Sequence, residues 1–229
     1  MGNHCFRISW FVTVDFQILL FAPMLVWVYY KYRKICLWLI AAVLWIIGIS
    51  IRLYLADRFN YKAVFIDDHN VEHRFWERFY TKPYCNWIPY TFGMLCACMY
   101  VNYKYQIKSD GIGNLLTGVW RNRIGAWGSL ILGTAIITAL VFPLMDAYAH
   151  FDNWTHEQNV TYLGLSSLIY SIAWSLVACS ILFGKIPFIL NIMTGGLWVP
   201  YSIPIYGVYL AMYGIVSGTY IGTYKSYWF

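Results

Sequence analysis

Long apolar stretches constrain this chain more than any other feature of its sequence. A helix needs about 20 predominantly apolar residues to cross a bilayer, and several stretches reach that length. Hydrophobic residues make up 60% of the 229 residues and charged residues only 11%, which is about half the charged fraction of a soluble domain. The sequence therefore predicts an all-α, polytopic integral membrane protein in which lipid is the immediate partner.

The apolar stretches predict about six transmembrane helices in one bundle. They cover residues 10–30, 35–55, 87–105, 124–145, 160–183 and 197–221. Since no repeat or low-complexity linker divides them, residues 1–229 are interpreted as one membrane domain. Arg52, near the end of the second span, is expected to snorkel to the interface. A short interfacial helix over residues 69–80 would carry Phe75, Trp76 and Phe79, and residues 106–123 read as a basic linker.

Charged residues predict which side of the membrane each loop faces. One set of loops holds the basic residues Lys31, Arg33, Lys34, Lys104, Lys108, Arg121, Arg123 and Lys185. Basic short loops face the cytoplasm, so both termini and the 146–159 loop are expected to be luminal or extracellular, in the plasma membrane or the endoplasmic reticulum. Asn153 and Asn159 begin Asn-x-Thr sequons, which are glycosylated only on that side. The net charge of +6 thus reflects topology, and no nucleic-acid partner is expected.

Two polar residues, Asp15 and Gln17, interrupt the first apolar stretch. Asp15 lies roughly 7 Å inside the predicted span. A carboxylate at membrane depth is costly unless something requires it, so such residues are functional candidates. Asp15 could orient a histidine or hold an acceptor hydroxyl. The alternative is that it lies close enough to the interface to be solvated.

The stretch around Asp15 resembles a motif of the acyltransferase 3 family, in its nose-resistant-to-fluoxetine branch. That branch carries C-x3-S-W-Y-L-x-V-D-M-Q followed by a proline. The corresponding positions here are Cys5, Ser9, Trp10, Val14, Asp15, Gln17 and Pro23. The resemblance implies that Asp15 is a catalytic acid or orienting group, and that Trp10 and Gln17 shape a substrate site.

Two later segments resemble the same branch. Residues 80–93 resemble Y-x-K-P-W-x-R-x-x-P-Y-x-x-G, with Asn86 in the place of the arginine. Residues 198–213 resemble W-x-P-L-S-R-L-T-Y-x-x-Y-L-x-H-P, with Ile203 and Met212 in the places of the arginine and the histidine. The match covers the later two-thirds of the family domain. The earlier helices, which in the family hold the Arg and His thought to carry acyl transfer, have no counterpart.

Two functions remain open from the sequence. The resemblance implies a membrane acyltransferase that moves acyl groups other than aminoacyl groups to a membrane or luminal acceptor. Acyl-CoA would be its donor substrate, and no bound cofactor is expected. The replaced charged groups imply that this chain is truncated or inactive. The alternative is a non-catalytic membrane protein that binds or transports lipid or a hydrophobic small molecule, or that serves as a structural subunit.

Three other patterns in the sequence also have plainer interpretations. His69, Glu72 and His73 spell H-x-x-E-H, but no third ligand is evident, so no metal site is predicted. Cys5 and Cys85 share the predicted luminal side, where they could form a disulfide or remain unrelated thiols. Small residues on one face of the last span would let another helix approach closely, within the chain or from a partner. They are Gly207, Ala211, Gly214 and Gly218.

Overall fold

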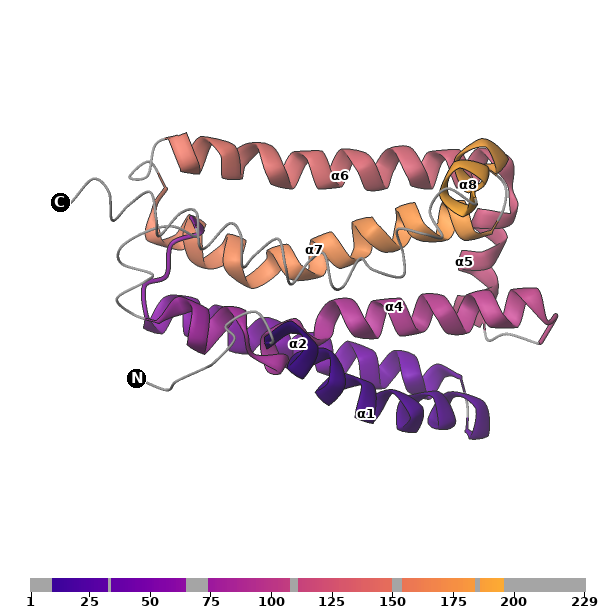
Figure 1. Ribbon diagram of the computed structural model, residues 1–229, viewed down its shortest axis with the longest axis horizontal. Helices are drawn as coiled ribbons and strands as arrows, with labels where there is room; N and C mark the ends of the chain where they lie inside the picture. The colour runs from indigo at the N-terminus through magenta and orange to yellow at the C-terminus, as the bar shows by residue number, and fades with distance from the viewer. Residues whose placement is uncertain are drawn as a thin grey trace.

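The computed structural model describes residues 10–32, 34–64, 74–107, 111–149, 154–183 and 186–195, and every element in these ranges is helical (Figure 1). The long helices are α1 (Trp10–Lys31), α2 (Ile35–Arg58), α4 (Pro83–Lys104), α6 (Arg123–Ala149) and α7 (His156–Leu182). The short ones are η2 (Trp76–Tyr80), a π-helical turn, α5 (Gly111–Arg121) and α8 (Pro187–Thr194). The all-α prediction is confirmed for this part of the chain.

Four of these helices are long and apolar enough to cross a membrane, namely Val14–Lys31, Ile35–Arg58, Arg123–Ala147 and His156–Leu182. They coincide with four of the predicted spans. The helix α4 overlaps the predicted span 87–105, but its asparagine, tyrosine and tryptophan side chains make it less apolar. The predicted span 197–221, with the small residues from Gly207 to Gly218, lies outside the described residues. The described part of the chain is therefore all-helical, and four of its helices have the length and composition of membrane spans.

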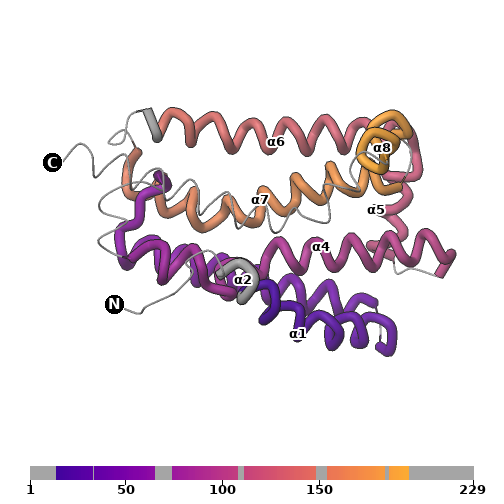
Figure 2. Tube along the Cα trace, in the orientation of Figure 1, coloured from indigo at the N-terminus to yellow at the C-terminus, as the bar shows by residue number. Residues whose placement is uncertain are grey.

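Long helices run in opposite directions and pack side by side in the pairs α1 and α2, α2 and α4, and α6 and α7. The helix α7 packs against α2, α4 and α6, and α1 packs against α2 and α4. Figure 2 shows α4, α6 and α7 running lengthwise together, with α5 and α8 at one end. The described basic residues Lys31, Lys34, Lys104, Arg121 and Arg123 belong to helix ends on this α5/α8 side. The opposite side holds the end of α2 and the start of α7.

An aromatic cluster closes this opposite side. The cap cluster, which we define as Tyr61, Phe75 and Phe79, is buried together with Cys85 and Leu163. Phe75 stacks on Phe79 and meets Tyr61 edge to face, each at a centroid distance of 5.0 Å. Phe75 and Phe79 therefore pack inward, whereas the sequence predicted that they would lie in the membrane interface. The reason is that the ends of α2, α4 and α7 leave apolar surface that the rings cover.

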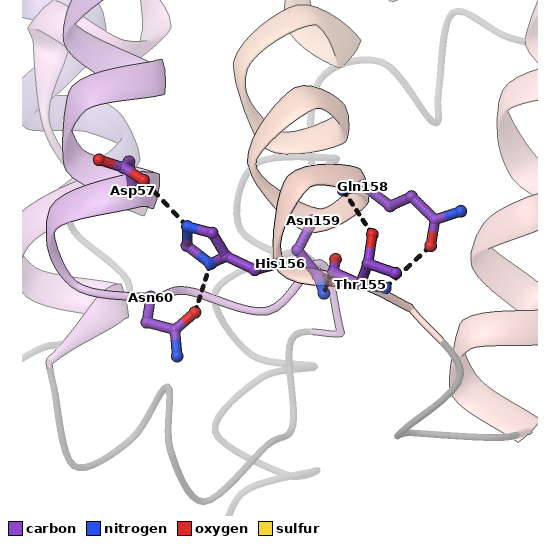
Figure 3. A network of polar contacts seen from close by, with 6 residues as sticks. All are labelled: Asp57, Asn60, Thr155, His156, Gln158 and Asn159. Atoms are coloured by element: carbon purple, nitrogen blue, oxygen red, sulfur yellow. Dashed lines mark hydrogen bonds and ion pairs between the residues drawn. The ribbon is translucent and has the colours of Figure 1, made fainter.

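The same end is fixed by polar contacts between α2 and α7 (Figure 3). His156 lies between Asp57, at 2.9 Å from Nε2, and Asn60, at 2.5 Å from Nδ1. Thr155 and Gln158 form a capping box, in which the Gln158 N–H donates to the Thr155 hydroxyl and the Thr155 N–H donates to the Gln158 side chain. Such a box satisfies backbone donors that the first helical turn leaves open. The start of α7 is thereby held beside the end of α2.

Asn159, one of the two predicted glycosylation sites, belongs to this polar framework. Its Oδ1 accepts the Ala63 N–H at 2.7 Å, and its Nδ2 donates to the carbonyls of Thr155 and Trp154. The residue is buried. A glycan on Nδ2 would need the nitrogen that these hydrogen bonds use, so the fold disfavours Asn159 as an acceptor. Asn153 lies outside the described residues.

Candidate functional site: an elongated cleft

A cleft of about 900 Å³ lies among η2, α2, α4, α6 and α7. The cap side contributes Phe75, Trp76, Phe79 and Tyr80, and α4 contributes Asn86, Pro89, Phe92, Gly93 and Cys96. The α7 wall consists of Leu163, Ser166, Ser167, Tyr170, Ser171, Trp174, Ser175 and Ala178. The lining on α7 runs from Leu163 to Ala178, which is roughly 22 Å of helix. The cleft is therefore elongated along the helices.

Arg52 of α2 is the charged residue of the described lining, and its side chain is only 8% exposed. Its Nε donates to the Leu163 carbonyl at 2.9 Å, and its Nη1 donates to the Cys85 carbonyl at 3.0 Å. The guanidinium carbon lies 4.8 Å from the centroid of the Phe79 ring. Backbone oxygens of two helices and one aromatic face thus position the cation inside the protein, where the sequence had predicted a side chain that snorkels to the interface.

The positive charge of Arg52 has no carboxylate partner within ion-pair distance among the described residues. The Arg52 Nη2 donates no hydrogen bond to a described residue. It is also not one of the unpaired polar atoms that the described residues bury completely. Arg52 lies six residues before the end of α2, or roughly 9 Å of helix. The cation consequently marks one end of the cleft, near the cap cluster.

Serines give the α7 wall a polar composition, but two of them direct their hydroxyls into their own helix. Ser171 donates to the Ser167 carbonyl at 2.6 Å and Ser175 donates to the Ser171 carbonyl at 2.7 Å. Such bonds to the preceding turn satisfy a hydroxyl without water. This wall can therefore lie against a hydrocarbon chain without leaving these donors unpaired.

The structure does not bring the predicted site residues to this cleft. Asp15 is half-buried in α1, and its Oδ1 is enclosed without a hydrogen-bond partner in the described part of the chain. Gln17 is exposed, and the Trp10 side chain lies outside the described set. Neither Asp15 nor Gln17 lines the cleft. The grouping of Asp15 and Gln17 in one cleft-lining site is thus not seen, and side chains two residues apart on a helix do not share a face.

The remaining predictions divide between described and undescribed residues. Cys85 is a free thiol and is completely buried. Of the two possibilities for this residue, a disulfide or an unrelated thiol, the structure therefore matches the second. The His69–His73 segment and the positions Ile203 and Met212 lie outside the described residues. Asn86, in the place of the family's arginine, does line the cleft, and its Nδ2 donates to the carbonyls of Tyr80 and Lys82.

Arg52 is the site residue that sequence reasoning missed. The sequence held a signal for it, because Arg52, like Asp15, is an ionisable residue within an apolar span, and such residues are functional candidates.

Comparison of the chain with protein-family models, with curated proteins and with solved structures finds no match in any of the three. The assignment of function therefore rests on the geometry of the cleft.

Proposed function

We propose that this chain is a membrane protein that binds a lipid or another long hydrophobic molecule in the cleft between α4 and α7. The observation that carries the proposal is the cleft itself, which is elongated, mostly apolar and reached by a few polar groups. Ligand pockets have volumes of about 300–1,000 Å³ and combine apolar walls with a small number of placed polar groups. The volume of about 900 Å³ suits a large ligand of this kind.

One observation connects the cleft with the acyltransferase resemblance. Tyr80, Asn86, Pro89 and Gly93 occupy motif positions in residues 80–93, and all four line the cleft. This supports an acyl chain as the bound group and keeps acyl transfer from acyl-CoA as a second proposal. Among the described lining residues there is no histidine or carboxylate that could act as a base, so our first proposal stops at binding.

Filling the cleft at Gly93 is expected to abolish binding without disturbing the fold. A Cβ built on Gly93 meets no atom within 4 Å, so a phenylalanine there would project into open space within the cleft. We expect Gly93→Phe to weaken binding of a radiolabelled long-chain acyl compound by roughly tenfold or more, measured on the purified full chain in detergent.

Gly128→Phe is the matched control, because a Cβ at Gly128 also meets nothing within 4 Å and Gly128 does not line the cleft. Wild-type affinity is expected for this variant. A Gly93→Phe protein that elutes and unfolds like the wild type and still binds with wild-type affinity would refute the cleft as the binding site.

We also propose six crossings with both termini on the luminal or extracellular side. The basic residues Lys31, Lys34, Lys104, Arg121 and Arg123, at the α5/α8 end, support this because basic loops face the cytoplasm. Expression with microsomes is expected to give a glycosylated band that endoglycosidase removes. Asn153→Gln should eliminate that band, and Asn159→Gln should leave it unchanged because Asn159 is hydrogen-bonded and buried. Protease digestion of the 146–159 loop from the cytosolic side would contradict this topology.

A further inference from the structure

We infer that the cleft selects an anionic amphiphile, whose carboxylate or phosphate group pairs with Arg52 while its hydrocarbon chain runs toward Cys96 and Ala178. The inference rests on the proposed binding function and adds the charge and orientation of the ligand. Its basis is the juxtaposition of one buried cation with a long, largely apolar wall.

The first argument is the charge of Arg52. An ionised side chain buried away from water is strongly unfavourable unless another charge or a set of hydrogen bonds compensates it. The two carbonyls and the Phe79 ring compensate Arg52 in part, but none of them carries a negative charge. With no carboxylate beside it among the described residues, the guanidinium remains a net positive charge. An anionic ligand group would neutralise it.

The second argument is the direction of the unused donors. A guanidinium has five N–H donors in a fixed fork. The protein accepts one from Nε and one from Nη1, which leaves three on Nη1 and Nη2. Two of those three are on Nη2, where one N–H lies on the terminal edge of the group and the other on the edge shared with Nε, and these are the edges at which a guanidinium pairs with a carboxylate or phosphate. The backbone contacts thus orient Arg52 and leave both Nη2 donors unused by the described residues.

The third argument is the position of Arg52 within the cleft. The cation lies beside Leu163, at the cap end of the α7 lining. From there the lining continues for roughly 22 Å along α7, past Phe92 and Trp174 to Ala178. A molecule with its charge at one end and its hydrocarbon along the rest matches this order. A free inorganic anion would pair with Arg52 but leave the apolar length unfilled.

The test compares ligands of identical chain length and different head groups on the full chain in nanodiscs of neutral phosphatidylcholine at pH 8. The first pair is palmitic acid and hexadecanol, and the second is a lysophosphatidic acid and the matching monoacylglycerol. The wild type is expected to bind each anionic ligand at least about tenfold more tightly than its neutral partner. Inorganic phosphate alone is expected not to compete at millimolar concentration.

Arg52→Gln is expected to remove the preference for the anionic ligand, so that the two ligands of each pair bind this variant with equal affinity. Arg52→Lys should retain a weaker preference, because an ammonium keeps the charge but lacks the fork. Equal wild-type affinities within each pair would overturn the inference whether or not Arg52→Gln folds, as would full displacement by inorganic phosphate. Failure of all four ligands to bind the wild type would instead overturn the proposed binding function.

Discussion

Replacement of Phe79 by alanine is expected to lower the free energy of unfolding by about 3–5 kcal/mol, the usual cost of removing a fully buried phenylalanine ring. The Phe79 side chain is 2% exposed. It stacks on Phe75, meets Tyr61 edge to face at 6.0 Å, and lies under the guanidinium of Arg52. Loss of the ring would leave a cavity in the cap cluster and remove a cation–π contact from Arg52.

The change is measured by denaturant or thermal unfolding of the purified protein in detergent. Phe142→Ala is the matched control, because Phe142 of α6 is 64% exposed and its removal creates no internal cavity. The account requires a clear difference between the two variants. Equal losses of stability in Phe79→Ala and Phe142→Ala would show that the cap cluster is not part of the packed core.

Leucine at Gly133 is expected to separate α6 from α7 and destabilise the protein by about 1–3 kcal/mol, the usual cost of overpacking. A Cβ at this position would lie 2.8 Å from the Ala173 carbonyl oxygen and 2.8 Å from a methyl carbon of Val177. The Ala173 oxygen belongs to the backbone and cannot rotate away. Close approach of helices at glycine is a common way for membrane helices to associate, and α6 and α7 form an extensive contact.

Gly128→Leu serves as the control in the same helix, because a Cβ at Gly128 meets nothing within 4 Å. Thermal unfolding in detergent is expected to show a lower midpoint for Gly133→Leu and an unchanged or higher midpoint for Gly128→Leu, since leucine favours helix more than glycine does. A Gly133→Leu protein as stable as the wild type would show that the two helices do not cross closely at this position.

Apolar runs predicted the long helices well because a helix that meets lipid must satisfy its own backbone hydrogen bonds. The predicted span 35–55 became Ile35–Arg58 and the predicted span 10–30 became Trp10–Lys31. The predicted start of α7 at residue 160 was late, since the first turn from His156 is polar and is stabilised by the Thr155 capping box. The sequence predicted a linker where the structure has the helix α5. This helix is amphipathic, with Trp120 buried, and it is too short to stand out as an apolar run.

The candidate site was harder to predict than the helices. Asp15 and Arg52 are both ionisable residues in apolar spans, and the sequence does not show which side of a helix faces the protein interior. The apolar neighbours of each residue are compatible with either orientation. Packing of α2 against α4 and α7 determines that Arg52 faces the protein interior, because its partners Cys85 and Leu163 are distant in sequence. The cap cluster and its buried neighbour Leu163 likewise come from three chain segments that meet only after folding.

The central claim, that a hydrocarbon chain occupies the cleft between α4 and α7, is tested most directly by photo-crosslinking. A long-chain fatty acid with a diazirine near its terminal carbon is bound to the full chain in nanodiscs, irradiated, and located by peptide mass spectrometry. The account predicts attachment at residues 92–96 of α4 and 174–178 of α7, with loss of labelling when unlabelled fatty acid is in excess. Attachment confined to the exposed face of α6, around Ile131 and Phe142, and unaffected by competitor would contradict it.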